Sequence, residues 1–327
     1  MLNHMCNKCL YCYGPLLNGE SDYHTSCAKK FFGSSNPPVL PYSRDNISEL
    51  ALKVIQNSIA VTGVQPKLSL DINRGGRQQK DKLTIVGLCG SYILKPQSEK
   101  YNSMPELEDV TMKMAAIAGI PTAEHCLIRM TDGELAYITK RMDRGKSGVK
   151  YSMLDMCQLS NRLTEHKYRG SYLQLASVVK SYSTQSMIDV QNFWKLVLFS
   201  WISGNSDMHC KNFSLIDMKD GRGYVMAPAY DLLAVLLTGI EDNDEMAMTL
   251  IGSGVGDTQY IGGYNRSSFV DAMEMSGVEG KYANKVIDKM VAYKEKWYDI
   301  IGKSFLSEKL KEAYFLLLEN RINRLKI

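Results

Sequence analysis

A dozen residues in the second half of the chain, GNSDMHCKNFSL at positions 204–215, concentrate side chains that can do chemistry. Asp207 and Asn212 form the spacing D-x-x-x-x-N, with His209 and Cys210 between them. A carboxylate can accept the proton of a hydroxyl group, and carboxylate and amide oxygens can hold Mg²⁺. His209 and Cys210 offer no tetrahedral ligand set at this spacing, so we expect packing or hydrogen bonding from them.

A second carboxylate follows in the segment APAYDLL, where Asp231 comes after two strand-like runs, NFSLI and GYVMAP. A hairpin formed by these runs would return the chain and bring Asp231 back to Asn212. Protein kinases use this order of a proton-accepting Asp, a metal-binding Asn and a metal-binding Asp. The D-x-x-x-x-N spacing is common by chance, so the order of the residues carries more weight than the spacing.

Upstream, the strand-like run YILKP places Lys95 near its end, where kinases keep a lysine that contacts the nucleotide phosphates. The helix predicted at residues 105–120 offers Glu106 and Glu108 as partners for this lysine. The stretch VTGVQPKLSL, residues 61–70, enters the first strand and can cover the phosphates, although it lacks a Gly-x-Gly-x-x-Gly pattern. Taken together, these elements favour a kinase site over a set of unrelated polar residues.

The elements that must position these residues divide the chain into four parts. Residues 1–33 are rich in cysteine, and residues 34–46 read as a linker. Residues 47–142 begin with a helix and continue with short strands, among them a hairpin around TDGE, as expected of a nucleotide-binding lobe. Residues 143–327 are mostly helical, and the first helix is predicted at residues 152–163. We therefore predict an α+β, bilobal, protein-kinase-like fold with a strand-rich N-lobe and a mostly helical C-lobe.

The composition limits the class of protein. The chain has 327 residues, 45% of them hydrophobic, and its net charge of +4 permits a phosphate-bearing ligand without indicating a nucleic-acid-binding protein. No apolar run reaches the roughly 18 residues of a membrane span, and the first residues lack the pattern of a signal peptide. We therefore expect a cytoplasmic protein that does not contact a membrane.

The N-terminal segment carries a candidate metal site. Cys9 and Cys12 form C-x-x-C, and His24 and Cys27 form H-x-x-C after a short spacer. Three thiolates and one imidazole make a closed tetrahedral set for Zn²⁺, and the metal would supply folding energy to a segment too small to fold alone. Cys6 could substitute for one ligand. The alternative is a reduced, metal-free hairpin that packs through YCYGPL and KKFFG.

The segments TGVQPKLSL, YILKP, YITKRMDR, MLDMCQL, GNSDMHCKNFSL and APAYDLL together resemble the HipA-type serine/threonine kinases of bacterial toxin–antitoxin systems. The resemblance covers about residues 48–320. It implies transfer of the γ-phosphate of Mg·ATP to a protein hydroxyl, with aminoacyl-tRNA synthetases as a substrate class, and autophosphorylation. It also implies a helix-turn-helix antitoxin as partner, so that DNA would be contacted only through the antitoxin.

The resemblance assigns a role to each matching residue. Asp207 corresponds to the catalytic Asp, Asn212 and Asp231 to the Mg²⁺ ligands, and Lys95 to the phosphate-binding lysine with Glu108 as its preferred partner. The stretch TKRM at residues 139–142 corresponds to the hinge that holds adenine. Further nucleotide-binding candidates are Gly63, Val64, Gln65, Lys140, Arg141, Met142 and His209.

The sequence also departs from the long members of the family. We expect this chain to lack the family's further N-terminal subdomain and to resemble the short, HipT-like form, in which a separate small protein supplies that piece. In the regulatory loop, which reads NSIAVTG, Thr62 is the hydroxyl nearest to the glycine and Ser58 is the next, so these are the candidates for autophosphorylation.

A different class of function stays open. The chain could be the nucleotide-binding subunit of an antitoxin-containing repressor complex with little kinase activity. The complete set of Lys95, Asp207, Asn212 and Asp231 favours the kinase, because a binding module has no need of all four residues. A zinc hydrolase built on His209 is not supported, because no second histidine lies near it in the sequence.

Overall fold

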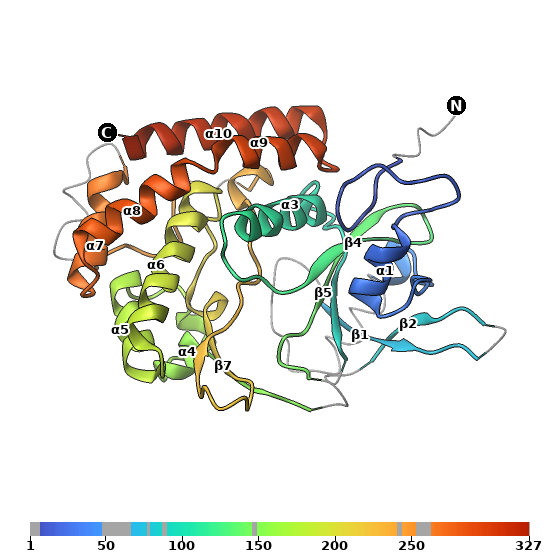
Figure 1. Ribbon diagram of the computed structural model, residues 1–327, viewed down its shortest axis with the longest axis horizontal. Coiled ribbons are helices and arrows are strands. Elements are labelled where there is room, and N and C mark those ends of the chain that lie inside the picture. The colour runs from blue at the N-terminus through green and yellow to red at the C-terminus, as the bar shows by residue number, and fades with distance from the viewer. Residues whose placement is uncertain are drawn as a thin grey trace. The chain divides into compact units, whose positions relative to one another are not determined.

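The computed structural model describes residues 7–47, 67–76, 79–86, 90–145, 149–240, 244–252 and 263–326. The chain divides into two compact units, and most of its helices and several of its strands are labelled in Figure 1. The first unit holds Met1–Asp109, Ala123–Arg141 and Lys303–Phe305, and the second holds Val110–Thr122, Met142–Gly302 and Leu306–Ile327. Six candidate site residues lie outside the described residues, namely Cys6, Ser58, Thr62, Gly63, Val64 and Gln65.

The first unit is built on a five-stranded antiparallel sheet with the strand order β2-β1-β3-β5-β4. Its strands are β1 (Leu68–Asn73), β2 (Lys82–Ile85), β3 (Tyr92–Lys95), β4 (His125–Arg129) and β5 (Leu135–Lys140). β4 and β5 form the hairpin predicted around TDGE, and Gly133 in its turn has a φ of 89°, which glycine adopts without strain. β3 lies between two partner strands, so its last residue, Lys95, is fixed in register opposite Tyr137.

Helix α3 (Met104–Ile117) confirms the helix predicted at residues 105–120. It ends shortly before Gly119, whose φ of 71° is the left-handed conformation that commonly terminates a helix. The boundary between the two units falls within α3, after Asp109. The turns that carry Glu108 and Asp109 therefore belong to the same unit as Lys95.

The Cys-rich segment is part of the first unit. Its helix α1 (Thr25–Phe32) ends at Gly33, which has a φ of 74°. Phe31 and Phe32 are buried, and their rings lie 5.8 and 6.4 Å from the ring of Tyr92 on β3. Aromatic packing therefore anchors α1 to this unit.

The second unit contains a small sheet and most of the helices, in agreement with the predicted helical region. The sheet has the order β6-β7-β8, with β6 (Ser152–Asp155), β7 (Ser214–Asp217) and β8 (Val225–Met226). Its helices are α4 (Met156–Leu159), α5 (Tyr172–Tyr182), α6 (Ser186–Ile202), α7 (Arg266–Met275), α8 (Gly280–Val291), α9 (Lys294–Lys303) and α10 (Glu308–Lys326). Short 3₁₀ turns are η2 (Thr164–His166), η3 (Cys210–Asn212) and η4 (Val235–Leu237).

The helix predicted at residues 152–163 is wrong over its first residues. Ser152–Asp155 forms strand β6, which pairs antiparallel with β7, and the helix itself spans only Met156–Leu159. Pairing with a strand more than fifty residues away in sequence overrides the local helical pattern. The Asp155 side chain then accepts a hydrogen bond from the Gln158 backbone N–H at 2.9 Å and starts the helix at the next residue.

Helix α6 forms the centre of the second unit. Its side chains are buried on nearly all sides, including Phe193, Trp194, Phe199 and Trp201. Such a helix needs no polar stripe, and its buried aromatic surface fixes the start of the polar loop that follows at residue 203. Within the described residues, no helix combines the length and apolar character needed to cross a membrane.

Candidate active site

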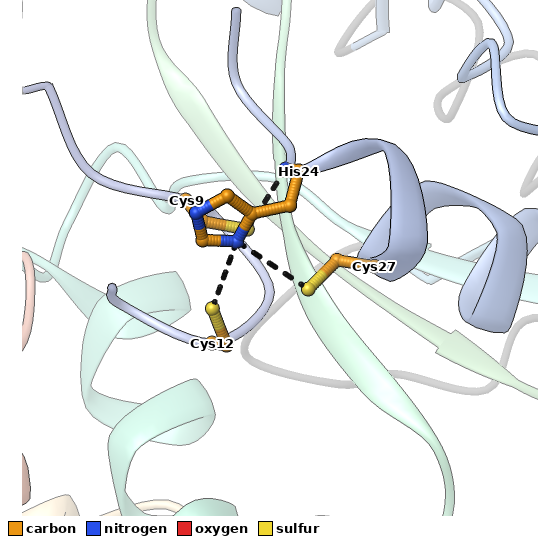
Figure 2. A group of neighbouring side chains, drawn as sticks. All are labelled: Cys9, Cys12, His24 and Cys27. Atoms are coloured by element: carbon orange, nitrogen blue, oxygen red, sulfur yellow. Dashed lines mark hydrogen bonds between the residues drawn. The ribbon is translucent and has the colours of Figure 1, made fainter. Parts of the chain in front are cut away.

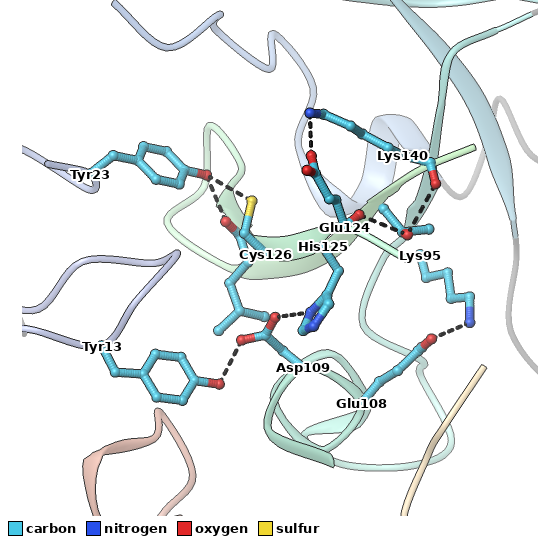
Figure 3. Close-up of polar contacts among 11 residues, drawn as sticks. Tyr13, Tyr23, Lys95, Glu108, Asp109, Glu124, His125, Cys126 and Lys140 are labelled. Carbon is cyan, nitrogen blue, oxygen red and sulfur yellow. Dashed lines mark hydrogen bonds and ion pairs between the residues drawn. The ribbon is translucent and has the colours of Figure 1, made fainter. Parts of the chain in front are cut away.

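Lys95 and Glu108 form a buried ion pair in the first unit. Lys95 Nζ lies 2.5 Å from Glu108 Oε1, and the side chains are 5% and 2% exposed (Figure 3). The Lys95 ammonium also lies 5.4 Å from the centre of the Tyr137 ring on the neighbouring strand. A buried ammonium requires such compensation, because its transfer from water costs several kcal/mol. The structure thus brings together the strand lysine and the helix glutamate that the sequence analysis preferred.

Glu106, the other glutamate offered by this helix, is in a different environment. Its Oε2 atom is buried and has no hydrogen-bond partner within the described part of the chain. Burial raises the pKa of Glu106 to about 7, because the charged carboxylate loses its hydration. Glu106 therefore differs from Glu108, whose charge is compensated by Lys95.

The loop that carries Asp207 in the second unit is organised by hydrogen bonds among its own backbone and asparagine side chains. The Asp207 carbonyl accepts hydrogen bonds from His209 N–H at 2.8 Å and from Asn212 Nδ2 at 3.1 Å. Asn205 Oδ1 accepts from Asp207 N–H at 3.3 Å, and Asn212 N–H donates to the His209 carbonyl at 2.9 Å. The five-residue step from Asp207 to Asn212 is thus a compact turn with a fixed geometry, as a proton-accepting site needs.

Tyr168 is a contact of Asp207 that the sequence analysis did not identify. Its hydroxyl donates to Asp207 Oδ1 at 2.7 Å, and its ring stands edge-on to His209 at 5.2 Å. Tyr168 and Asp207 are 39 positions apart in the sequence, and no motif around Tyr168 indicates the contact. Only the tertiary fold could reveal it.

His209 is buried within the same loop, at 6% exposure. Burial lowers its pKa, while the nearby Asp207 carboxylate acts in the opposite direction. Its Nδ1 atom has no hydrogen-bond partner within the described residues. The ring contact with Tyr168 agrees with the expected packing role, and the nucleotide contact assigned to His209 stays a prediction.

Asp231 follows the predicted hairpin, which is present as β7 and β8. Its backbone has a φ of 59°, a left-handed conformation that costs a residue with a side chain roughly 1–2 kcal/mol. The neighbouring Tyr230 is half-buried, and its hydroxyl donates to the Lys211 carbonyl at 2.7 Å. The residue before Asp231 is thereby tied to the residue before Asn212, as the hairpin prediction required.

The predicted hinge residues lie where the chain passes from one unit to the other. Lys140 and Arg141 end the strand-rich unit, and Met142 begins the helical one. The Lys140 ammonium pairs with Glu124, and the Arg141 backbone N–H donates to the Ser91 carbonyl at 2.9 Å. These contacts fix the end of β5, while an adenine contact at these residues stays a prediction.

The four predicted zinc ligands meet in the first unit. One ligand atom from each of Cys9, Cys12, His24 and Cys27 lies within 4.8 Å of the others (Figure 2). The His24 Nδ1 atom lies 3.3 Å from Cys12 Sγ and 3.6 Å from Cys27 Sγ. The structure therefore shows a Cys3His cluster that could hold a metal ion, as the spacing predicted.

Comparison with known proteins gives a consistent result. Residues 59–297 match the family described as HipA-like C-terminal domain. A Haemophilus influenzae protein named "Putative kinase" is 26% identical over 83% of this chain and 82% of its own length. The serine/threonine-protein kinase toxin HipA of Shewanella oneidensis is 26% identical over 66% of this chain and 51% of its own length. The chain thus spans only about half of the latter relative.

Solved structures show the same fold. The chain superimposes on Shewanella oneidensis HipA, solved with HipB and operator DNA, with a TM-score of 0.65 at 21% identity, over 85% of this chain and 71% of that one. The Helicobacter pylori kinase CtkA gives a TM-score of 0.52 at 16% identity, over 78% of this chain and 93% of that one. These likenesses establish the α+β, kinase-like fold. Since the family match covers well over half of the chain, the protein belongs to the HipA-like C-terminal domain family.

Proposed function

We propose that the protein is an ATP-dependent serine/threonine kinase of the HipA type. The observation that carries the proposal is the buried ion pair between Lys95 and Glu108, which stand on the strand and helix where kinases keep this pair. A buried lysine is expensive to maintain, so a structural role alone would be served as well by an apolar pair. The named kinase among the relatives supports the same activity.

The residues of the Asp207 loop fit phosphate transfer. Asp207 would accept the proton of the substrate hydroxyl as this oxygen attacks the γ-phosphorus of ATP and the bond to the β-phosphate oxygen breaks. Lys95 would hold the nucleotide phosphates. Because the transition state is stabilised mainly by positioning and charge, the fixed geometry of the loop is what the reaction demands.

The donor chemistry fits Mg²⁺. Asn212 Nδ2 donates to the Asp207 carbonyl, which directs the amide so that its oxygen is the atom left to bind a cation. Asn212 and the Asp231 carboxylate would hold the ion, which neutralises charge on the phosphates when it is bound. Zn²⁺ is assigned to the N-terminal cluster, because three thiolates and an imidazole match its tetrahedral coordination.

The proposed partners follow from the relatives. A structure of Shewanella oneidensis HipA contains HipB and operator DNA, which supports an antitoxin as partner of this chain and DNA contact through that antitoxin. A small separate subunit and a protein substrate, with aminoacyl-tRNA synthetases as a candidate class, complete the proposal. Thr62 and Ser58 are the candidate sites of autophosphorylation.

The kinase proposal is tested by intact-mass spectrometry of the purified chain after incubation with Mg·ATP, beside Asp207→Asn. We expect the wild type to gain phosphate and the variant to stay unmodified while it still binds ATP in a titration. A purified antitoxin and a panel of aminoacyl-tRNA synthetases would be included as acceptors. Phosphate transfer by Asp207→Asn at the wild-type rate, or no ATP binding by the wild type, would overturn the proposal.

A further inference from the structure

The N-terminal segment reaches the helix that carries Glu108. We infer that zinc bound by Cys9, Cys12, His24 and Cys27 holds this segment together so that Tyr13 braces Asp109 on α3 and thereby positions Glu108 for Lys95. The metal site stands on its own geometry, whereas the effect on Lys95 rests on the proposed kinase function. All of these residues belong to the first unit.

Two nitrogen–sulfur distances within the cluster match those of a tetrahedral metal site. Zn–S bonds of about 2.3 Å and Zn–N bonds of about 2.0 Å at tetrahedral angles place sulfur and nitrogen about 3.5 Å apart. His24 Nδ1 lies 3.3 Å from Cys12 Sγ and 3.6 Å from Cys27 Sγ. His24 Nδ1 and these two thiols are therefore spaced as they would be around one ion, with Cys9 Sγ within 4.8 Å of each, and four protein ligands leave no position for a substrate.

The surroundings of His24 select the nitrogen that binds the metal. Its Nε2 atom lies 2.8 Å from the Pro15 carbonyl, which can only accept a hydrogen bond. Nε2 must therefore carry the proton, and Nδ1, the atom that faces the sulfurs, keeps its lone pair for a metal. Zinc-binding histidines in general have their second nitrogen fixed by an acceptor in this way.

The turn that carries the first two ligands also holds Tyr13, in a strained backbone conformation. Cys9 N–H donates to the Gly14 carbonyl at 2.8 Å, and Tyr13 N–H donates to the Cys9 carbonyl at 2.9 Å, which closes a tight turn around Cys12. Tyr13 within it has a φ of 65°, a left-handed conformation that favours glycine. A tyrosine keeps this strained backbone only if the surrounding structure compensates for it, so its side chain is expected to have a role.

That side chain is directed at α3. The Tyr13 hydroxyl donates to Asp109 Oδ2 at 2.5 Å, and the other oxygen of this carboxylate lies 2.7 Å from His125 Nδ1 (Figure 3). Tyr13 is 2% exposed and Asp109 is fully buried. Asp109 is the next residue after Glu108, so a shift of this helical turn would move the partner of Lys95.

The rest of the segment is joined to β4. The Leu10 carbonyl, between the first two ligands, accepts from Leu127 N–H at 3.2 Å, and the Tyr23 hydroxyl, just before His24, donates to the Leu127 carbonyl at 2.6 Å. Both sides of the metal cluster therefore contact one residue of the sheet. Loss of the metal would release these two stretches together with Tyr13.

The metal is tested first, on the full chain purified without added zinc. We expect one zinc per chain by elemental analysis, and after exchange with Co²⁺ the absorption bands of tetrahedral thiolate coordination. Cys12→Ser should lose the metal, and Cys157→Ala, whose thiol lies outside the cluster, should keep it. If Cys12→Ser fails to fold, the cobalt spectrum of the wild type still decides, and a wild type with no bound metal would overturn the inference.

The brace is tested by Tyr13→Phe, with Tyr11→Phe as the matched control, and by calorimetric titration with ATP and with adenosine. Tyr13→Phe keeps the aromatic ring and the four zinc ligands and removes only the hydrogen bond to Asp109. We expect about tenfold weaker ATP binding and unchanged adenosine binding, because Lys95 contacts the phosphates, which adenosine lacks. In a Lys95→Ala background, Tyr13→Phe should have no further effect on ATP. Equal ATP affinity of Tyr13→Phe and wild type would overturn the brace. A wild type that binds zinc but not ATP would overturn the kinase proposal and the brace while leaving the metal site in place.

Discussion

Glu108 Oε1 lies 2.5 Å from Lys95 Nζ, and this pair joins the sheet of the first unit to helix α3. Removing one charge of a buried pair leaves the other in a poorly hydrated place, at a cost of about 3 kcal/mol. We therefore expect Glu108→Gln to lower the free energy of unfolding by about this amount, measured by urea titration. Phosphate transfer should fall at least a hundredfold, or about 2.7 kcal/mol of transition-state stabilisation.

A double variant separates the two effects of this pair. Lys95→Met with Glu108→Leu removes both charges and keeps apolar volume, which is often neutral or stabilising for a buried ion pair. We expect this variant to regain most of the stability and to remain inactive. If it transferred phosphate at the wild-type rate, Lys95 would have no part in catalysis.

Glu106 makes stability depend on pH. Its pKa in the folded chain is about 7 because of burial, above the ordinary value of 4.5, so the folded state binds more protons than the unfolded state between these two values. Stability should therefore fall as pH rises from about 5 to 8, by at most about 3 kcal/mol from this group. Glu106→Gln should remove this loss and stabilise the protein at pH 8 but not at pH 5.

Thermal unfolding of Glu106→Gln across this pH range measures the effect. The matched control is Glu99→Gln, an exposed glutamate of the same unit, which should leave the pH profile unchanged. If Glu106→Gln and the wild type lost the same stability between pH 5 and 8, the pKa of Glu106 would not be raised in the folded protein. Its carboxylate would then be in contact with water, and this prediction would be wrong.

Local patterns predicted the parts of the fold whose causes are local. Three such parts are the hairpin around TDGE, helix α3 and the Cys3His cluster. Turn residues indicate the hairpin, residues at the helix ends indicate α3, and ligand spacing indicates the cluster, and in each case these residues are close in sequence. Strand β6 was missed because its pairing with β7 reaches from Ser152 to Asp217. This tertiary pairing overrides the local helical pattern, and a single sequence does not indicate which distant strand will pair.

Contacts between distant residues of the candidate sites likewise could not be predicted from the sequence. Tyr13 and Asp109 are 96 residues apart, and Tyr168 and Asp207 are 39 apart. Neither tyrosine belongs to a motif with a fixed spacing to its partner, so no pattern could indicate the contact. Lys95 and Glu108 could be paired in advance because kinases place them on successive elements.

The end of α10 is held by a carboxylate between two arginines. Glu245 accepts from Arg324 Nη1 and Nη2 at 2.5 and 3.0 Å and also pairs with Arg321, which is 4% exposed. Glu245→Gln would leave the Arg321 charge buried without this carboxylate, so we expect a loss of about 2–3 kcal/mol of unfolding free energy.

A surface ion pair of the same unit provides the control for Glu245. Arg222 Nη2 lies 2.7 Å from Asp220 Oδ2, and the two side chains are 51% and 39% exposed, so Asp220→Asn should leave the free energy of unfolding nearly unchanged. Urea unfolding of both variants gives the comparison. Equal losses would mean that burial of Arg321 contributes nothing to the energy of its pair.

Tyr168 is expected to orient Asp207 for the substrate hydroxyl. The Tyr168 hydroxyl donates to Asp207 Oδ1 at 2.7 Å. This hydrogen bond fixes one carboxylate oxygen and thereby also sets the direction of the other. Tyr168→Phe keeps the ring contact with His209 and removes the hydrogen bond, which to a charged group is worth about 1.5 kcal/mol or more. We expect the rate of phosphate transfer to fall about tenfold, with KM for ATP unchanged because Asp207 acts on the acceptor.

Steady-state kinetics of Tyr168→Phe with a protein acceptor distinguish this role from two others. Tyr182→Phe, an exposed tyrosine at the end of α5, is the control and should behave as wild type. A higher rate in Tyr168→Phe would mean that the tyrosine hydroxyl occupies the place of the substrate and blocks it. A raised KM for ATP would mean that the loss reaches the nucleotide through the loop. Only a lower kcat at constant KM fits a side chain that holds the proton acceptor in position, since that step involves the acceptor hydroxyl and not the binding of ATP.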